Sequence, residues 1–107
     1  IIQKAKMYKD GIAISASETP QNRVIAAQAA DELLNIAGIQ ASFVVFPEND
    51  KISISARSIG DVNVQYIVEK LGGGGNKSTA GAQIAGKTEK EVITALLTAI
   101  DDYLKNE

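Results

Sequence analysis

Apolar and polar residues alternate near the start of the chain, over residues 11–15. Ile12 and Ile14 fall on one side of this segment, which is the pattern of a half-buried strand. The segment before it, residues 1–9, has no clear period, and its structure stays open at this stage.

A helix is predicted next, from the signal Thr19-Pro20. Threonine is a common N-cap, and proline suits the first helical position because an N–H group there has no intrahelical partner. The helix is expected to end at Gly38, since glycine readily takes the left-handed conformation that closes a helix. Its expected buried positions are spaced three or four apart: Val24, Ala27, Ala30, Leu34 and Ala37.

Two segments on either side of a polar turn predict an antiparallel hairpin. Residues 41–46 are mostly β-branched or aromatic, Pro47 is expected to end this strand, and residues 48–50 form the turn. The second strand, 51–57, alternates in character, so Arg57 is expected on the face away from the core. The core-facing set is Ile52, Ile54 and Ala56, and the opposite set is Ser53, Ser55 and Arg57.

Two helices and a strand complete the prediction. Asp61 is expected to cap a short helix that ends at Gly72, and a strand follows over residues 79–85. Thr88 and Glu91 have the spacing of a capping box that starts a last helix. The apolar positions of the two helices are Val64, Ile67, Val68 and Leu71, then Val92, Leu96, Ala99, Ile100 and Leu104. The fold class is therefore α/β, with a small mixed β-sheet of about five strands and helices packed on it.

Composition narrows the function. The chain has 107 residues, enough for one domain over 1–107, and its net charge of -2 argues against tight binding along a long nucleic acid. It contains no cysteine and no histidine, so we expect it to bind a ligand rather than to catalyse a reaction alone. No apolar segment approaches the ~18 residues of a membrane span, and no direct membrane contact is expected. The first residue is Ile, which we take as a sign of excision from a longer chain.

Four consecutive glycines, Gly72 to Gly75, are the one feature that composition does not explain. Ordering such a run costs much conformational entropy, so it needs a reason. One reason is a concave nest of backbone N–H groups that binds phosphate or carboxylate oxygens. The other is a flexible connection with a glycine helix cap.

Arg57 is the side chain best suited to an anionic ligand. A guanidinium group can clamp a phosphate through two hydrogen bonds or stack on a base. The alternative is an exposed arginine with no role, as most surface arginines are. The polar residues after the glycines, Asn76 to Thr79, have the same two interpretations.

Residues 52–64 and 71–76, with the small pair Ala80 and Gly81, carry a resemblance to a known family. They resemble the DHH-associated domain of the DHH phosphoesterases, and look closest to the GdpP-type cyclic-di-AMP phosphodiesterases of Gram-positive bacteria. In that family an S-x-R-S strand end precedes a short helix and a glycine loop that usually ends in His. Here the loop ends in Asn76, which cannot carry a positive charge at neutral pH.

The resemblance implies a division of labour within a longer parent protein. An upstream DHH domain in cis would hold two manganese ions that activate water, whereas this domain would need no cofactor and would bind a cyclic dinucleotide or short oligonucleotide. The parent would lie at the cytoplasmic face of the cell membrane, and whether it forms a homodimer stays open. No catalytic or metal-binding residue is assigned to this chain. The implied substrate-binding residues are Arg57, Ser58, Gly73, Gly74, Gly75, Asn76 and Ala80.

Three alternatives remain open. One is the same domain in a soluble DHH oligoribonuclease or pAp-type phosphatase. Another is the tRNA-binding carboxy-terminal domain of alanyl-tRNA synthetase, which the net charge of -2 disfavours. The third is a structural module that binds no nucleotide.

Overall fold

The computed structural model describes residues 6–9 and 11–105. A single six-stranded sheet runs through the molecule in the order β1-β2-β3-β4-β6-β5. Strands β2 and β3 are parallel and the other neighbours are antiparallel, which confirms a mixed sheet of the α/β class, with six strands instead of about five. The elements are β1 (Lys6–Lys9), β2 (Ile12–Ala16), α1 (Arg23–Leu33), β3 (Ala41–Glu48), β4 (Lys51–Ser58), α2 (Val64–Glu69), β5 (Gly74–Gly75), β6 (Thr79–Ala85) and α3 (Glu89–Lys105).

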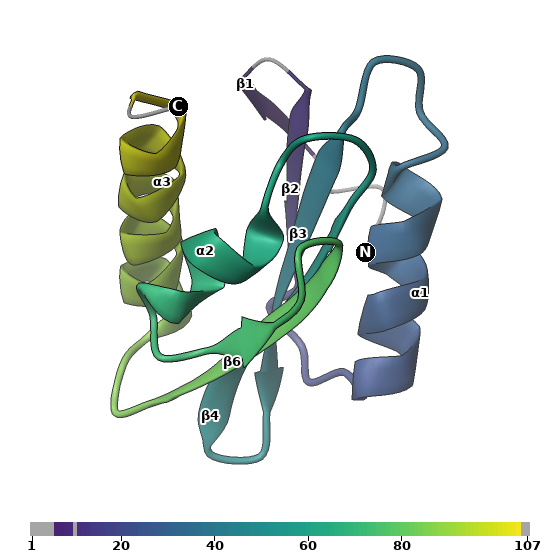
Figure 1. Cartoon of the computed structure of the whole chain (residues 1–107). Coiled ribbons are helices and arrows are strands. Elements are labelled where there is room, and N and C mark those ends of the chain that lie inside the picture. Colours follow the sequence, from purple (N-terminus) through teal and green to yellow (C-terminus); the bar gives the residue numbers. More distant parts are fainter. Residues whose placement is uncertain (1–5, 10, 106–107) are drawn as a thin grey trace.

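The helices cover the sheet unequally (Figure 1). Helices α2 and α3 pack on one face, over the larger hydrophobic core, which includes Phe43 and Ile67. Helix α1 packs on the other face over a smaller core that includes Val44, Phe46 and Leu33. Because α1 packs mainly against β3 and β4, the same face of β6 lies beyond its reach.

Two of the strands were not predicted. Strand β1 pairs with β2 at one edge of the sheet, within the segment that had no clear period. Strand β5 is formed by Gly74 and Gly75, although glycine has a low β-propensity. The strand forms because β6 offers these residues a pairing partner. Strand β3 also continues through Pro47 to Glu48, so Pro47 does not end it as predicted, and the turn is made by Asn49 and Asp50.

Helix α1 starts later and packs on another side than predicted. Its N-cap is Asn22, whose Oδ1 accepts a hydrogen bond from Ile25 N at 2.9 Å, so the assignment of Thr19 was wrong. The helix ends at Leu33, five residues before Gly38. Apolar residues lie on two sides of this helix, and the sheet packs against the side that does not include Val24. Val24 is therefore 66% exposed. The buried residues are Ala26, Ala29, Ala30 and Leu33, of which only Ala30 was predicted.

The start of α2 was misplaced by two residues, whereas α3 follows its prediction. Asn63 caps α2, its Oδ1 accepting from Tyr66 N at 3.1 Å, so Asp61 is not the cap. Thr88 and Glu91 form the predicted capping box, with Thr88 N donating to Glu91 Oε1 at 2.9 Å. The predicted core positions of both helices are buried except for two that are half-buried, Leu71 and Leu104. Within the described residues, no helix has the length and apolar character to cross a membrane.

Candidate functional site

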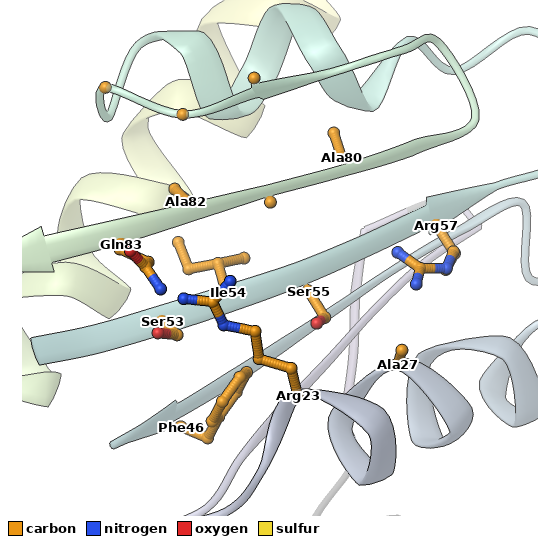
Figure 2. Close-up of a pocket in the computed structure, with 14 residues that line it drawn as sticks. Arg23, Ala27, Phe46, Ser53, Ile54, Ser55, Arg57, Ala80, Ala82 and Gln83 are labelled. Carbon is orange, nitrogen blue, oxygen red and sulfur yellow. The ribbon is translucent and has the colours of Figure 1, made fainter. Parts of the chain in front are cut away.

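A groove of about 540 Å³ opens on the α1 side of the sheet, between α1 and the glycine-rich edge. This volume is within the range of pockets that hold small organic ligands, ~300–1,000 Å³. Figure 2 shows the groove running along β4, with arginine side chains at its two ends. Its lining residues are Arg23, Ala27, Phe46, Ser53, Ile54, Ser55, Arg57, Gly72, Gly73, Gly74, Ala80, Gly81, Ala82 and Gln83.

The register of the strands explains why the sheet is hollow here. Ser53 lies opposite Gln83 of β6, and Ser55 lies opposite Gly81. Directly opposed residues project to the same face, so small side chains, and at Gly81 none, form the middle of the floor. Among the described residues, no helix covers this half of the face, so the volume that larger side chains would fill stays open as the groove.

Arg57 stands at one end of the floor in a defined orientation. Its side chain is on the face opposite the larger core, as predicted, but it is only 18% exposed, so the interpretation as a solvated surface arginine is wrong. Nε lies 3.2 Å from Asp31 Oδ1 of α1, and Nη1 donates to the Ala56 carbonyl at 2.8 Å.

These contacts leave part of the Arg57 guanidinium available. The group has five N–H donors, and among the described residues only Ala56 and Asp31 face them. Nη1 therefore keeps one N–H group and Nη2 keeps both, which is the fork that binds a phosphate through two hydrogen bonds. The bond to the Ala56 carbonyl orients the guanidinium toward the groove, and the exposed Asp31 carboxylate is its second contact.

The start of the glycine run ends α2. Gly72 has a φ of +86° and its N–H donates to Glu69 O at 3.1 Å, while Gly73 N donates to Val68 O at 2.9 Å. This pair of bonds is a Schellman motif, and it confirms the expected glycine cap. The interpretation of the next residues as a nest or a flexible connection is replaced by an edge strand, since Gly74 and Gly75 pair with β6.

Close packing against β6 explains the glycines at positions 73 and 75. A Cβ atom built on Gly73 would lie 2.2 Å from Gly81 O, and one built on Gly75 would lie 2.5 Å from Ala80 Cα. At Gly74 the added atom would meet nothing within 4 Å, although this residue lines the groove. Gly73 and Gly75 therefore let β5 approach β6, and Gly74 keeps the wall of the groove open.

The structure brings together four of the seven residues that the resemblance implies: Arg57, Gly73, Gly74 and Ala80 line the groove. Ser58, Gly75 and Asn76 are not among its lining residues. Ser58 is buried, with Oγ donating to Val62 O at 2.6 Å. Asn76 Oδ1 accepts from Thr79 N at 2.9 Å and from Ser78 N at 3.0 Å, so its side chain closes the turn between β5 and β6.

The other end of the groove was missed from the sequence. Arg23 Nε lies 2.9 Å from Glu48 Oε1 and 3.2 Å from Oε2, and Ser53 Oγ donates to Glu48 Oε1 at 3.0 Å. The hydrogen bond from Arg23 and the weaker one from Ser53 hold the pKa of the Glu48 carboxyl below its ordinary value, against the opposing effect of burial. Gln83 lies beside this cluster. When the Gln83 amide is turned so that its oxygen points toward Arg23, that oxygen accepts a hydrogen bond from the guanidinium.

A prediction with the correct start and buried side of α1 would have placed Arg23 at the groove. Residues 23, 27 and 31 are one helical turn apart and form the stripe of α1 that faces the groove. Because the predicted helix began at Pro20 and buried Ala27, Arg23 was not assigned to any surface.

The groove is lined by polar side chains that donate hydrogen bonds, and not by a cluster of acidic side chains. In the part of the chain that the structure describes, no three His, Cys, Asp or Glu side chains gather at one place. Two guanidinium groups, two hydroxyls and an amide instead define a polar groove with donors for an anionic or heterocyclic ligand. The protein is therefore a small α/β domain with a polar groove on one face of its sheet.

The family of this domain is established by its sequence. The chain belongs to the DHHA1 domain family, which matches residues 9–106. It is 47% identical to the cyclic-di-AMP phosphodiesterase PdeA of Listeria monocytogenes, over all of this chain and 17% of that protein. It is 42% identical to the cyclic-di-AMP phosphodiesterase GdpP of Bacillus subtilis, over 98% of this chain and 17% of that protein. The chain thus spans about a sixth of the length of these relatives.

Solved structures share the fold at lower identity. An exopolyphosphatase-related protein from Bacteroides fragilis superposes with a TM-score of 0.82 at 21% identity, over 95% of this chain and 32% of that one. A pGpG-specific phosphodiesterase, PggH from Vibrio, gives 0.67 at 19% identity, over 94% and 36%. The C-Ala domain of Aquifex aeolicus alanyl-tRNA synthetase gives 0.61 at 17% identity, over 85% and 95%. These likenesses confirm the fold.

Proposed function

We propose that this chain is the substrate-binding domain of a cyclic-di-AMP phosphodiesterase and that Arg57 binds a phosphate group of the ligand in the groove. The observation that carries the proposal is the orientation of Arg57, whose Nη1 and Nη2 keep a fork of N–H groups available. Gly74 leaves room beside it for a ligand to lie along the edge strand. The substrate is taken from the relatives named as cyclic-di-AMP phosphodiesterases at 42% to 47% identity.

Asp31 does not prevent this role. Its carboxylate has one contact to Arg57, at 3.2 Å, and its side chain is 64% exposed. An exposed ion pair of this kind contributes ~0–1 kcal/mol, less than a charge-assisted contact to a phosphate at ~1.5–3 kcal/mol. A phosphate can therefore displace the carboxylate or share the guanidinium with it.

Hydrolysis would need groups from outside this chain. The described residues offer no ligand set for the two manganese ions that the resemblance implies, so these ions would belong to an upstream DHH domain in cis. Within the parent, this chain would bind and orient the dinucleotide while the other domain activates water. The parent would act in signalling at the cytoplasmic face of the membrane.

Equilibrium titration with cyclic-di-AMP tests the proposal. Arg57→Ala is expected to weaken binding by about tenfold or more, the loss of one charge-assisted fork. Lys105→Ala is the matched control, because it removes the same charge from α3 on the other side of the sheet. Equal affinities of the Arg57→Ala variant and the unsubstituted chain would refute the proposed role of Arg57.

A soluble DHH exonuclease would use the same groove for a linear ligand. Tighter binding of the linear dinucleotide pApA than of cyclic-di-AMP would favour that class. The tRNA-binding function is supported only by the shared fold at 17% identity.

A further inference from the structure

The chain has only two arginines, and both line the same groove. Arg57 and Arg23 stand at its opposite ends, with Ser55 between them (Figure 2). The β4 positions beside them, 53 and 57, are four residues apart, which corresponds to ~13 Å along a strand. A single phosphate group is much smaller than this spacing, so a ligand that reaches both ends has to be longer than one phosphate.

We propose that Arg23 and Gln83 form a second subsite that holds the base of the second nucleotide of a dinucleotide ligand. The inference rests on the proposed function, because it assumes that the first phosphate lies at Arg57. In this proposal, the Arg23 end of the groove distinguishes a dinucleotide from a mononucleotide.

The pairing of Arg23 favours a base over a second phosphate. Glu48 contacts Arg23 Nε through both carboxylate oxygens, at 2.9 and 3.2 Å, and is itself held by Ser53. The Glu48 side chain is only 16% exposed, so a ligand cannot displace it as it could the exposed Asp31. The charge of Arg23 is thus balanced by a fixed carboxylate that would repel a phosphate.

The flat face of Arg23 remains available. Its side chain is 65% exposed, and a guanidinium plane held by a carboxylate can stack on an aromatic base. Gln83 contacts the Arg23–Glu48 pair in either orientation of its amide: Nε2 donates to Glu48 Oε1 at 3.4 Å, or, with the amide turned, its oxygen accepts from Arg23. Gln83 therefore helps to hold the guanidinium plane on which a base would stack, and the second group of its amide can meet the edge of that base. Figure 2 shows Arg23 extending from α1 over β4 toward Gln83, so the two groups act on the same space.

The test compares AMP with the linear dinucleotide pApA, each titrated into the unsubstituted chain, Arg23→Ala, Arg23→Lys and Arg57→Ala. We expect Arg23→Ala to weaken pApA binding about fivefold, as for loss of one base-stacking contact, and to leave AMP binding unchanged. Arg23→Lys keeps the charge but loses the flat face, so it is expected to behave like Arg23→Ala. Lys105→Ala again controls for net charge.

Each contrary result overturns a different statement. Unchanged pApA affinity in Arg23→Ala, with a loss in Arg57→Ala, refutes the second subsite and leaves the proposed function intact. Full rescue by Arg23→Lys refutes base stacking. An equal loss for AMP and pApA in Arg23→Ala refutes the dinucleotide discrimination. If neither ligand binds the unsubstituted chain, the proposed function fails and the inference fails with it.

Discussion

Replacing Gly73 by alanine is expected to detach the edge strand from the sheet. The added Cβ atom would lie 2.2 Å from Gly81 O and 2.7 Å from Ala82 Cβ, far inside ordinary contact distance. Both neighbours belong to β6, which is paired with β4 on its other side, so the backbone cannot give way cheaply. Overpacking of this kind costs ~1–3 kcal/mol, and because the clash is with backbone we expect about 2 kcal/mol.

Thermal and urea unfolding measure this cost. A loss of ~2 kcal/mol in a domain of this size lowers Tm by about 8 °C or more. The matched control is Gly74→Ala, where the added methyl group would meet nothing within 4 Å and the stability should be unchanged or slightly higher. Because Gly74 lines the groove, this control should nevertheless bind cyclic-di-AMP more weakly. Equal Tm values for the two variants would refute the packing explanation of the glycine run.

Two further predictions concern buried polar contacts. Ser58→Ala should lower stability by ~1–3 kcal/mol in urea unfolding, because the Val62 carbonyl loses the Ser58 Oγ donor, and should leave dinucleotide affinity unchanged. A clear loss of affinity would place Ser58 at the ligand. Glu48 has a folded-state pKa below its ordinary value, chiefly through Arg23, so its contribution to stability is present at neutral pH and is lost as the pH falls through that lowered value. Glu48→Gln should therefore make the loss of Tm between about pH 7 and about pH 3 shallower. A Tm that falls as steeply with decreasing pH in Glu48→Gln as in the unsubstituted chain would contradict this.

Elements with one clear apolar face could be predicted from the sequence. Helix α3 has a single apolar stripe and a capping box, and both are present as predicted. Helix α1 has apolar residues on two sides, so its packing was decided by the sheet, which the sequence does not display. Strand β5 forms only because β6 pairs with it, a nonlocal contact that overrides the local preference of glycine.

The candidate site was predicted only in part, for a related reason. Arg57 follows from strand alternation within β4, a local pattern. Arg23 and Gln83 reach the same groove from α1 and β6, elements far apart in the chain, so no local pattern joins them. The contacts of Ser58 and Asn76 with neighbouring backbone likewise appear only once the turns are folded.

Mapping the ligand on the isotope-labelled chain tests the central claim most directly. Titration with cyclic-di-AMP, followed through backbone amide resonances, should shift Arg57, Gly74 and Gly81 most, because they surround the groove. Amides of α3, on the other side of the sheet, should stay in place. The largest shifts on α3 and β1, or no shift at millimolar ligand, would contradict the assignment of this groove as the nucleotide site.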